Sequence, residues 1–342
     1  MSNPPAKPTL AHIAEACRVS PMTVSRALRR DGSVSEETRD KVLRVAEEMG
    51  YQPRPNMGRP RTRPEQRPAV DLVFGAELGG VSLFYADLLG SIEQELQRHG
   101  YDCVVRACHA AYAPFVALLE GLRESPAEKT LILGYFPLER LRIILEQRPG
   151  AVLVDHTGDP QLHGAYESVG FDNVEAARLA VRHLAGQGRT RIALLKGPPE
   201  HYFSRDIEQG YRETLGVLRL EVDPTLIWTA DFTSAGAQAA TWAAIERGVS
   251  FDAVFTNDEM AFGVIRELRQ RGMQLPADVA VAGCDGLELG QYLSPSLTTV
   301  ILDRRELGRA AVERLFAPRE EGGPHHIRLL PRLEVRESTA KE

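Results

Sequence analysis

Residues 9–28 read TLAHIAEACRVSPMTVSRAL, and this stretch decides the fold of the N-terminal part of the chain. Apolar residues at helical spacing predict a first helix that begins after Thr9; they are Leu10, Ile13, Ala14 and Cys17. A short turn at Arg18 and Val19 follows. Ser20 then caps a second helix whose first residue is Pro21, because a proline costs no hydrogen bond at that position. The pattern predicts two short helices joined by a tight turn.

The next segment, SEETRDKVLRVAEEMGY (residues 35–51), predicts a third helix that Ser35 caps. The buried face of this helix is expected to consist of Val42, Val45, Ala46 and Met49. The second helix should turn Val24, Ala27 and Leu28 inward and its polar residues outward. Three short helices with short connections are typical of a helix-turn-helix unit, which we expect to span residues 1–52.

TVSRAL (residues 23–28), followed by VSEETRDKVLRVAEEMGY (34–51), resembles the DNA-binding head of the LacI/GalR family of bacterial regulators. The resemblance implies that the second helix reads base pairs, with Pro21, Met22 and Arg26 at the base-reading positions. Arg26 is the expected polar reader, because arginine can donate twice to guanine, whereas proline has no donor and methionine only a weak acceptor. The positions expected to hold DNA phosphates are Thr9, Thr23, Ser25, Arg29 and Ser35.

The turn of the helix-turn-helix departs from the family pattern at one residue. Arg18 stands where the family usually has glycine. If the backbone is left-handed at this position, a residue with a side chain costs about 1 kcal/mol there. This is a local penalty that does not exclude the fold.

Charge is distributed unevenly along the chain. The net charge of −6 by itself argues against a nucleic-acid partner. Residues 1–68, however, hold 13 Lys and Arg against 8 Asp and Glu, whereas the remaining residues hold 28 against 39. A basic head on an acidic body is expected when only the head meets phosphate.

From residue 69 onward, short apolar strands alternate with longer helical stretches, in two series. The first series comprises strands at 70–75, 102–107, 131–135 and 151–156. The second comprises strands at 168–171, 191–197, 226–230, 253–258 and 279–285. Such strands predict parallel sheets covered on both faces. The expected fold class is therefore an all-α head followed by an α/β effector domain of two doubly wound lobes, resembling periplasmic binding proteins. We expect an N-lobe of residues 69–167 and 299–326 and a C-lobe of residues 168–298 and 327–342.

In doubly wound sheets, ligands bind outside the carboxyl ends of the strands, and here those ends face the cleft between the lobes. Asp155, Asn257 and Asp285 stand at such ends and suit a hydrogen-bonding ligand, whereas Asp258 is better explained as a helix N-cap. Three segments of the body also resemble the LacI/GalR effector domain; they are VGFDNVEAARLAVRHLAGQGRTRIALLKG, NDEMAFGVIRELRQRGMQLPADVAVAGCD and SPSLTTV. The effector contacts that this resemblance implies are Asp155, Arg205, Phe232, Asn257 and Asp285.

Two departures from the family pattern touch this pocket. Ile207 stands where the family usually has its effector-binding arginine, and Arg205 lies two residues before it. Gly286 replaces a frequent second aspartate. The location of the pocket is therefore predicted, while the identity of the effector stays open.

Residues 53–68, PRPNMGRPRTRPEQRP, join the head to the body and contain five prolines. Family members usually have a short helix here that inserts a leucine into the minor groove, but interior prolines disfavour a helix and this segment has no leucine. Its core, Gly58-Arg59-Pro60-Arg61, resembles the AT-hook, so Met57, Arg59 and Arg61 are candidate minor-groove contacts. A flexible basic linker that only attracts phosphate is an equally good interpretation.

Taken together, the sequence predicts a DNA-binding transcriptional regulator that binds a palindromic operator as a homodimer and responds to a sugar-like effector. Dimerisation is expected through residues 69–342, and a tetramer is not expected because the C-terminal RESTAKE is too short for an added coiled coil. A solute-binding protein of the same fold is the alternative; the helix-turn-helix and the lack of a signal peptide disfavour it. A sugar-modifying enzyme is a third possibility, but the chain has no recognisable nucleophile motif or phosphate loop. We expect no cofactor or metal, and a cytoplasmic location.

Overall fold

The computed structural model describes residues 8–28, 34–51, 67–75, 82–108, 112–156, 162, 166–318 and 323–340. The chain divides into two compact units, Met1–Arg67 and Pro68–Glu342, which we call the head and the body. Among the described residues, none of the helices combines the length and the apolar character that crossing a membrane requires.

The described part of the head consists of three helices around a small apolar core. They are α1 (Leu10–Cys17), α2 (Pro21–Leu28) and α3 (Glu36–Glu48). The core is formed by Ile13, Ala14, Cys17, Val24, Ala27, Val42 and Ala46. The three predicted helices are confirmed, with one correction to the core. Met49 is 38% exposed, because α3 ends at Glu48 and Met49 is already its C-cap, and Tyr51 packs against the core instead.

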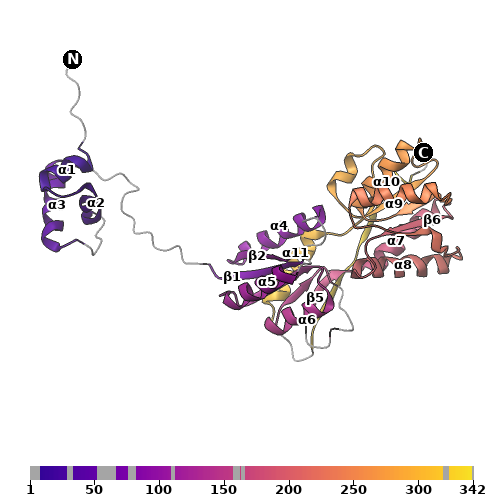
Figure 1. The fold of residues 1–342 in the computed structure, drawn as a ribbon, viewed down its shortest axis with the longest axis horizontal. Helices are drawn as coiled ribbons and strands as arrows, with labels where there is room; N and C mark the ends of the chain where they lie inside the picture. The colour runs from indigo at the N-terminus through magenta and orange to yellow at the C-terminus, as the bar shows by residue number, and fades with distance from the viewer. Residues whose placement is uncertain are drawn as a thin grey trace, which may run out of the picture. The chain divides into compact units, whose positions relative to one another are not determined.

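The N-lobe of the body is built on a parallel sheet with the strand order β11-β5-β4-β3-β1-β2. Its strands are β1 (Ala69–Gly75), β2 (Asp102–Cys108), β3 (Lys129–Gly134), β4 (Val152–Val154), β5 (Glu167–Phe171) and β11 (His326–Leu329). Its helices are α4 (Leu83–Arg98), α5 (Tyr112–Glu124), α6 (Leu138–Gln147) and α11 (Arg304–Phe316). Figure 1 shows α11, from late in the chain, beside α4. Side chains alternate between the two faces of the sheet: Leu131 and Leu133 pack with α4 and α11, whereas Ile132 packs with α5 and α6.

The C-lobe has a second sheet with the strand order β12-β10-β9-β8-β6-β7, in which β12 runs antiparallel to β10. Its strands are β6 (Ile192–Lys196), β7 (Ile227–Thr229), β8 (Ala253–Phe255), β9 (Ala280–Asp285), β10 (Thr298–Ile301) and β12 (Arg332–Glu334). Its helices are α7 (Asn173–Gly186), α8 (Tyr202–Leu218), α9 (Ser234–Glu246), α10 (Asp258–Gln270) and the 3₁₀ helices η1 (Pro224–Leu226) and η2 (Glu288–Tyr292). Residues on one face of this sheet pack with α7 and α8 and those on the other with α9 and α10. The predicted fold class of two parallel α/β lobes is confirmed.

The lobe boundaries differ from those expected from the sequence. β5 and β11 belong to the N-lobe sheet, and β10 belongs to the C-lobe sheet, each opposite to its expected lobe. The chain crosses between the lobes three times, after β5, after β10 and after β11, so each crossing lies one strand later than expected. The alternation of strands and helices shows where a strand is, but hydrogen bonding to a neighbour decides which sheet it joins.

Candidate functional site

The exposed face of α2 carries the residues expected to read DNA bases. Pro21, Met22 and Arg26 are all exposed, and Met22 is 64% accessible. Met22 and Arg26 are four residues apart and therefore lie on one side of the helix. Val24 and Ala27 are fully buried against the rest of the head and fix the rotation of α2. The helix thus presents to solvent the side that the sequence assigned to the major groove.

Hydroxyl groups gather at the N-terminal ends of the head helices. Ser20 Oγ accepts a hydrogen bond from the backbone N–H of Thr23 at 3.1 Å and lies 2.8 Å from Thr23 Oγ1. Ser35 Oγ accepts at 3.4 Å from the backbone N–H three residues on. Before α1, the backbone N–H of Thr9 donates to His12 Nδ1 at 3.4 Å. Helix N-termini favour anions, so Thr9, Thr23 and Ser35 lie where a phosphate would be stabilised.

Arg18 adopts the conformation for which the family uses glycine. Its φ of 54° and ψ of 44° lie in the left-handed region, and its backbone N–H closes α1 by donating to the carbonyl oxygens of Ala14 and Glu15. Its side chain is exposed. The turn geometry therefore matches a helix-turn-helix, at the cost of a non-glycine residue in a left-handed position.

Several residues assigned to DNA contacts lie outside the described residues. They are Arg29, Met57, Arg59 and Arg61. Ser25 is described and is partly exposed on α2.

In the body, Asp155 and Tyr202 connect the two lobes. Asp155 follows β4 in the N-lobe, and Tyr202 begins α8 in the C-lobe. The Tyr202 hydroxyl donates to Asp155 Oδ2 at 3.0 Å, and both side chains are buried. Asp155 also has a φ of 60°, a left-handed conformation that is uncommon for aspartate. An inter-lobe hydrogen bond therefore ends on a carboxylate that the sequence assigned to the effector.

The environment of this pair favours its neutral forms. Burial raises the pKa of Asp155 to about 7. The hydrogen bond from Tyr202 lowers this pKa, whereas the charge of Asp206 raises it further. Burial also raises the pKa of Tyr202 well above its ordinary value, and the charge of Asp155 adds to this. The hydrogen bond from Tyr202 thus opposes burial and favours the charged form of Asp155, but it does not outweigh burial.

Aromatic rings from both lobes form one cluster around His201 and Tyr202. We call them the cleft rings; they are Tyr135, His156, His201, Tyr202 and Phe232. The His201 ring stacks on Tyr135 of the N-lobe with 5.2 Å between centroids, and meets Phe232 of the C-lobe edge-on at 5.0 Å. His201 Nδ1 accepts from the backbone N–H of Phe203, and burial lowers the pKa of His201 to about 3. His201 is thus a neutral ring at neutral pH.

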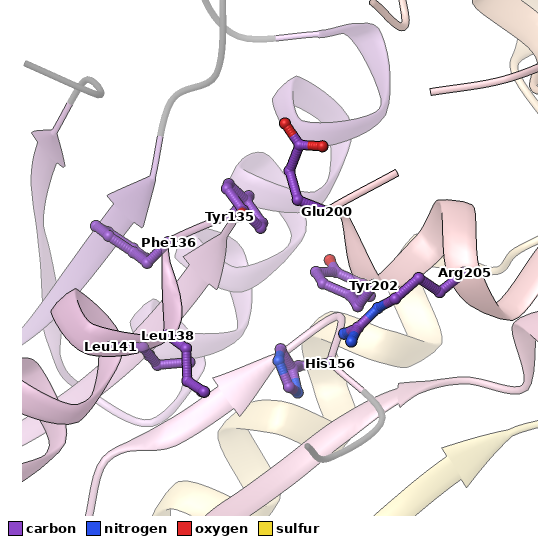
Figure 2. A pocket seen from close by; sticks show the side chains of 9 residues that line it. Tyr135, Phe136, Leu138, Leu141, His156, Glu200, Tyr202 and Arg205 are labelled. Atoms are coloured by element: carbon purple, nitrogen blue, oxygen red, sulfur yellow. The ribbon is translucent and has the colours of Figure 1, made fainter. Parts of the chain in front are cut away.

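A cavity of about 150 Å³ lies beside Tyr202 and is lined by both lobes. Figure 2 shows Tyr135, Phe136 and the two leucines of α6 on one side, and Glu200, Tyr202 and Arg205 on the other. The Arg205 side chain extends toward His156 (Figure 2). Of the five expected effector contacts, Arg205 is the one that lines this cavity, and Asp155 reaches it through Tyr202. The cavity has an apolar wall opposite a polar wall, as small-molecule sites do.

Phe232 is held in place by its own neighbours. Its φ of 65° is left-handed, and its ring covers Gly197, where an added Cβ would lie 2.1 Å from the ring. Gly197 directly follows β6, so the ring lies across the carboxyl end of that strand. The structure therefore brings Phe232 to the edge of the sheet where the sequence located the pocket.

The assignments of Asn257 and Asp258 need a correction. Asn257, and not Asp258, is the N-cap of α10, since its Oδ1 accepts from the backbone N–H of Met260 at 3.1 Å. Asp258 is fully buried and accepts from the Thr299 hydroxyl at 2.6 Å and from the Leu287 backbone N–H at 2.7 Å. The helix starts one residue earlier than the N-cap interpretation assumed, so Asp258 is its first residue, and its carboxylate faces into the lobe and ties α10 to the segments around β9 and β10.

Asp285, at the end of β9, is buried close to other carboxylates. Its φ is 132°, and burial raises its pKa well above 3.8, as does the charge of Asp258, whereas Arg304 lowers it. The Arg304 guanidinium donates to the backbone carbonyls of Asp285 and Gly286 and pairs with Asp87 of α4. Asp285 therefore belongs to a hydrogen-bonded crossing between the lobes.

Among the residues that the structure describes, the buried polar atoms without a hydrogen-bond partner include three at the carboxyl-end side of strands. They are Asn173 Oδ1, Ser204 Oγ and Thr256 Oγ1, in segments that follow β5, β6 and β8. A buried polar atom without a partner costs about 1–3 kcal/mol. Their place after the carboxyl ends of strands is where a polar ligand would be expected to supply partners.

Sequence reasoning missed most residues that line the cavity. His156, Glu200 and Tyr202 were not singled out, although His156 directly follows Asp155 and the other two lie shortly after β6. The rule that ligands bind at strand ends could have found Glu200 and Tyr202, because Gly197-Pro198-Pro199 directly follows β6 and the polar side chains come next, at the start of α8.

Comparisons with known proteins agree with this arrangement. Residues 9–54 match the family described as bacterial regulatory proteins, lacI family, and residues 181–339 match the periplasmic binding protein-like domain. The HTH-type transcriptional repressor CytR of Escherichia coli (strain K12) is 32% identical over 308 residues, covering 89% of this chain and 87% of that protein.

Solved structures resemble the chain over nearly its whole length. A transcriptional regulator CelR–cellobiose complex has 29% identity and a TM-score of 0.71, covering 97% of this chain and 99% of the other. A lac repressor dimer bound to operator and the anti-inducer ONPF has 23% identity and a TM-score of 0.70, covering 98% and 100%, and so supports the fold.

Proposed function

The chain belongs to the lacI family of bacterial regulatory proteins, and from this premise we propose that it is a transcriptional repressor controlled by a small molecule. It binds a pseudo-palindromic operator as a homodimer and responds to a sugar or sugar derivative in the cleft between the lobes. The observation that carries the proposal is the exposed face of α2, with Met22 and Arg26 on one side of a helix whose other side is buried.

Base reading is assigned to Pro21, Met22 and Arg26. The operator is first selected from a random DNA pool with the full-length protein. Arg26→Ala should then weaken binding to the selected site by about 1–3 kcal/mol and affect random DNA only slightly. Arg44→Ala, which removes an exposed arginine from α3, is the matched control and should not lower the preference for the selected site. Equal losses on both DNAs for Arg26→Ala would move this residue to the phosphate contacts.

Phosphate contacts are assigned to Thr9, Thr23, Ser25, Arg29 and Ser35. Support comes from the helix N-termini at which Thr9, Thr23 and Ser35 lie. Such contacts position the head and strengthen binding to any sequence. Thr23→Val should therefore weaken binding to the selected and the random DNA by similar factors, as measured by fluorescence anisotropy.

For the segment at 53–68 the proposal is an extended arm whose arginines lie in the minor groove at the operator centre. Arg59 and Arg61 are the contacts, with Met57 the one apolar candidate. The arginine-proline core and the missing leucine support this. Replacing the central A·T pairs of the operator by G·C should weaken wild-type binding but leave Arg59→Ala nearly unaffected. If the wild type is indifferent to this exchange, the segment is a charged tether.

The effector contacts are assigned to Asp155, Arg205, Phe232, Asn257 and Asp285. The buried inter-lobe position of Asp155, the cavity at Arg205 and the unpartnered polar atoms at strand ends support a polar ligand here. A structural relative is described as a CelR–cellobiose complex, which favours a sugar. A thermal-shift screen against sugars, sugar phosphates and nucleobases tests this, since a bound ligand raises the midpoint of unfolding.

Dimerisation is assigned to the body, residues 69–342. Large apolar side chains of the C-lobe are left exposed, including Trp242 on α9 and Leu289 and Tyr292 on η2. Such side chains are costly in water and typical of an interface. Light scattering at micromolar concentration should give the mass of two chains; a monomer with full operator affinity would overturn this assignment. The proposed role is regulatory and non-enzymatic, in the cytoplasm, as expected for a protein that meets DNA.

A further inference from the structure

Tyr202 has the position and the chemistry of a ligand within the cleft. It comes from the C-lobe, yet its hydroxyl donates to Asp155 of the N-lobe at 3.0 Å and hydrogen-bonds with Tyr85 of α4. Its ring lies 4.9 Å from the ring of His156 and 4.5 Å from that of His201, so aromatic side chains of both lobes surround it. The side chain is only 5% exposed. A six-membered ring with one hydroxyl is thus bound between the lobes by a carboxylate and by neighbouring rings.

The space next to Tyr202 is small for an effector. The cavity measures about 150 Å³, close to an engineered cavity that holds a single benzene ring, whereas ordinary ligand pockets have about 300–1,000 Å³. Its lining includes Tyr202 itself, so a movement of this ring would enlarge it directly. The same movement would free Asp155 Oδ2, which is the acceptor that a ligand hydroxyl requires.

The burial of Asp155 explains why a ligand hydroxyl can replace the Tyr202 hydroxyl, but the Tyr202 hydroxyl cannot leave without a replacement. Its carboxyl group is buried, and a buried carboxylate without a donor is strongly disfavoured. A ligand that displaces Tyr202 must therefore bring a hydroxyl donor of its own. The left-handed backbone of Asp155 holds the carboxyl group at this position in spite of the conformational cost.

We propose that Tyr202 is an internal competitor of the effector: its hydroxylated ring occupies the position at Asp155 that the effector's hydroxylated ring takes. The inference rests on the proposed function, because it assigns the effector to this cleft. It adds that the ligand is a hydroxyl-bearing six-membered ring of monosaccharide size, that one of its hydroxyls donates to Asp155, and that Tyr202 lowers its affinity.

The test compares Tyr202→Phe with Tyr211→Phe in the full-length chain. Tyr211 lies on the same helix and is also buried, but its hydroxyl donates to the Ile192 carbonyl inside the C-lobe at 2.8 Å. The probes are D-glucose, D-galactose and 4-methylphenol, the last of which is the tyrosine side chain as a free molecule. Binding is measured by calorimetry and by the shift of the unfolding midpoint.

At least one probe should bind the wild type, and the same probe should bind Tyr202→Phe about tenfold more tightly, because it no longer displaces a hydrogen bond to a carboxylate. Tyr211→Phe should unfold at a lower temperature than the wild type but bind the probe with unchanged affinity. A response to a hexose identifies a pyranose as the ligand class, and a response to 4-methylphenol alone identifies a phenol.

Equal or weaker binding of every probe to Tyr202→Phe would overturn the competition, since it would mean that the hydroxyl assists the ligand. Failure of all probes to bind either chain would overturn the hydroxylated-ring class. Operator binding is measured on the same samples. A wild type that binds a probe but no DNA refutes the proposed function and leaves the comparison of affinities intact.

Discussion

Replacing Asp155 by asparagine should remove a pH dependence from the stability of the body. Burial raises the pKa of Asp155 from 3.8 to about 7, so between these values the folded chain keeps a proton that the unfolded chain has released. The stability that depends on Asp155 is therefore fully present below pH 3.8 and is lost as the pH rises through 7. The difference between the two pKa values corresponds to about 4 kcal/mol, of which roughly 2 to 3 kcal/mol is lost between pH 5 and pH 8.

Asparagine keeps an oxygen that can accept the Tyr202 hydroxyl but has no proton to lose. Urea unfolding of the full-length chain at pH 5 and pH 8, followed by the fluorescence of Trp228 and Trp242 of the body, measures for both proteins how much the free energy of unfolding falls between the two pH values. Between pH 5 and pH 8, the free energy of unfolding of the wild type should fall by roughly 2 to 3 kcal/mol more than that of Asp155→Asn. The charge of Asp155 also raises the pKa of Asp285, so Asp155→Asn should lower the pKa of Asp285. The variant then loses less stability between pH 5 and pH 8, which increases its difference from the wild type.

Asp223→Asn is the control, since the pKa of Asp223 is lowered by hydrogen bonds from Thr225. The stability that depends on Asp223 is present above its unfolded pKa and is lost only in acid, so this variant should change stability equally at pH 5 and pH 8. If the wild type and Asp155→Asn lose the same free energy of unfolding between the two pH values, Asp155 is not protonated in the folded cleft and the reasoning fails.

Three further substitutions test local features. Arg18→Gly should stabilise the head by about 1 kcal/mol, seen as slower hydrogen exchange in α1 and α2, while Arg18→Ala should give no gain because alanine meets the same left-handed backbone. Gly197→Ala would place a Cβ 2.1 Å from the Phe232 ring and should weaken effector binding in calorimetry. Gly186→Ala is the control, because its added Cβ has no neighbouring atom within 4 Å, and it should bind the effector normally. Normal effector binding by Gly197→Ala would show that the Phe232 ring can move freely. Thr299→Val removes the hydroxyl donor of the buried Asp258 and should cost about 1–3 kcal/mol in urea unfolding. The equally buried Thr241→Val should cost less, since that hydroxyl bonds only within its own helix; equal costs would mean that Asp258 does not depend on Thr299.

The head could be predicted almost completely because its signals are local. Ser20 before Pro21, and Ser35 before an acidic first turn, mark helix starts that the structure reproduces. The error at Met49 arises where the helix ends, because the apolar spacing continues for one residue beyond the last helical one. Helix ends depend on the chain that follows as well as on the stripe itself.

The body could be predicted in class but not in connectivity. Apolar strands alternate with helices in both lobes, and the sequence locates nine of the twelve strands in the described residues but misses β10, β11 and β12. The sheet to which β5, β10 and β11 belong follows from long-range pairings such as Val154 with Val169 and Thr298 with Ala282, which no local pattern encodes. The three errors in the lobe boundaries have this single cause.

The candidate site was predictable where it depends on strand ends and not where it depends on packing. Asp155 and Asp285 were found because Asp155 directly follows β4 and Asp285 is the last residue of β9. His201 is the N-cap of α8 and Tyr202 its first residue, and their contacts with the N-lobe arise only when the start of α8 meets Tyr135, His156 and Asp155. The exchange of roles between Asn257 and Asp258 has a simpler cause: a helix start shifted by one residue turns the neighbouring side chain by about 100°.

Position 207 is where this chain differs most clearly from the family pattern. The family's effector-binding arginine usually stands there, but Ile207 is only 3% exposed and packs in the same apolar cluster as Tyr211 and Ala177. Arg205, two residues earlier on α8, is rotated by about 200° from it and lines the cavity from an exposed position. Restoring the arginine with Ile207→Arg should therefore bury a charge and lower the unfolding midpoint of the body by more than about 5 °C, whereas Ile207→Leu should change it little. Arg205→Gln should leave the midpoint nearly unchanged and weaken effector binding. An Ile207→Arg variant that is as stable as the wild type and binds the effector more tightly would show that this side of α8 faces the ligand, and that Arg205 has not taken over the arginine's role.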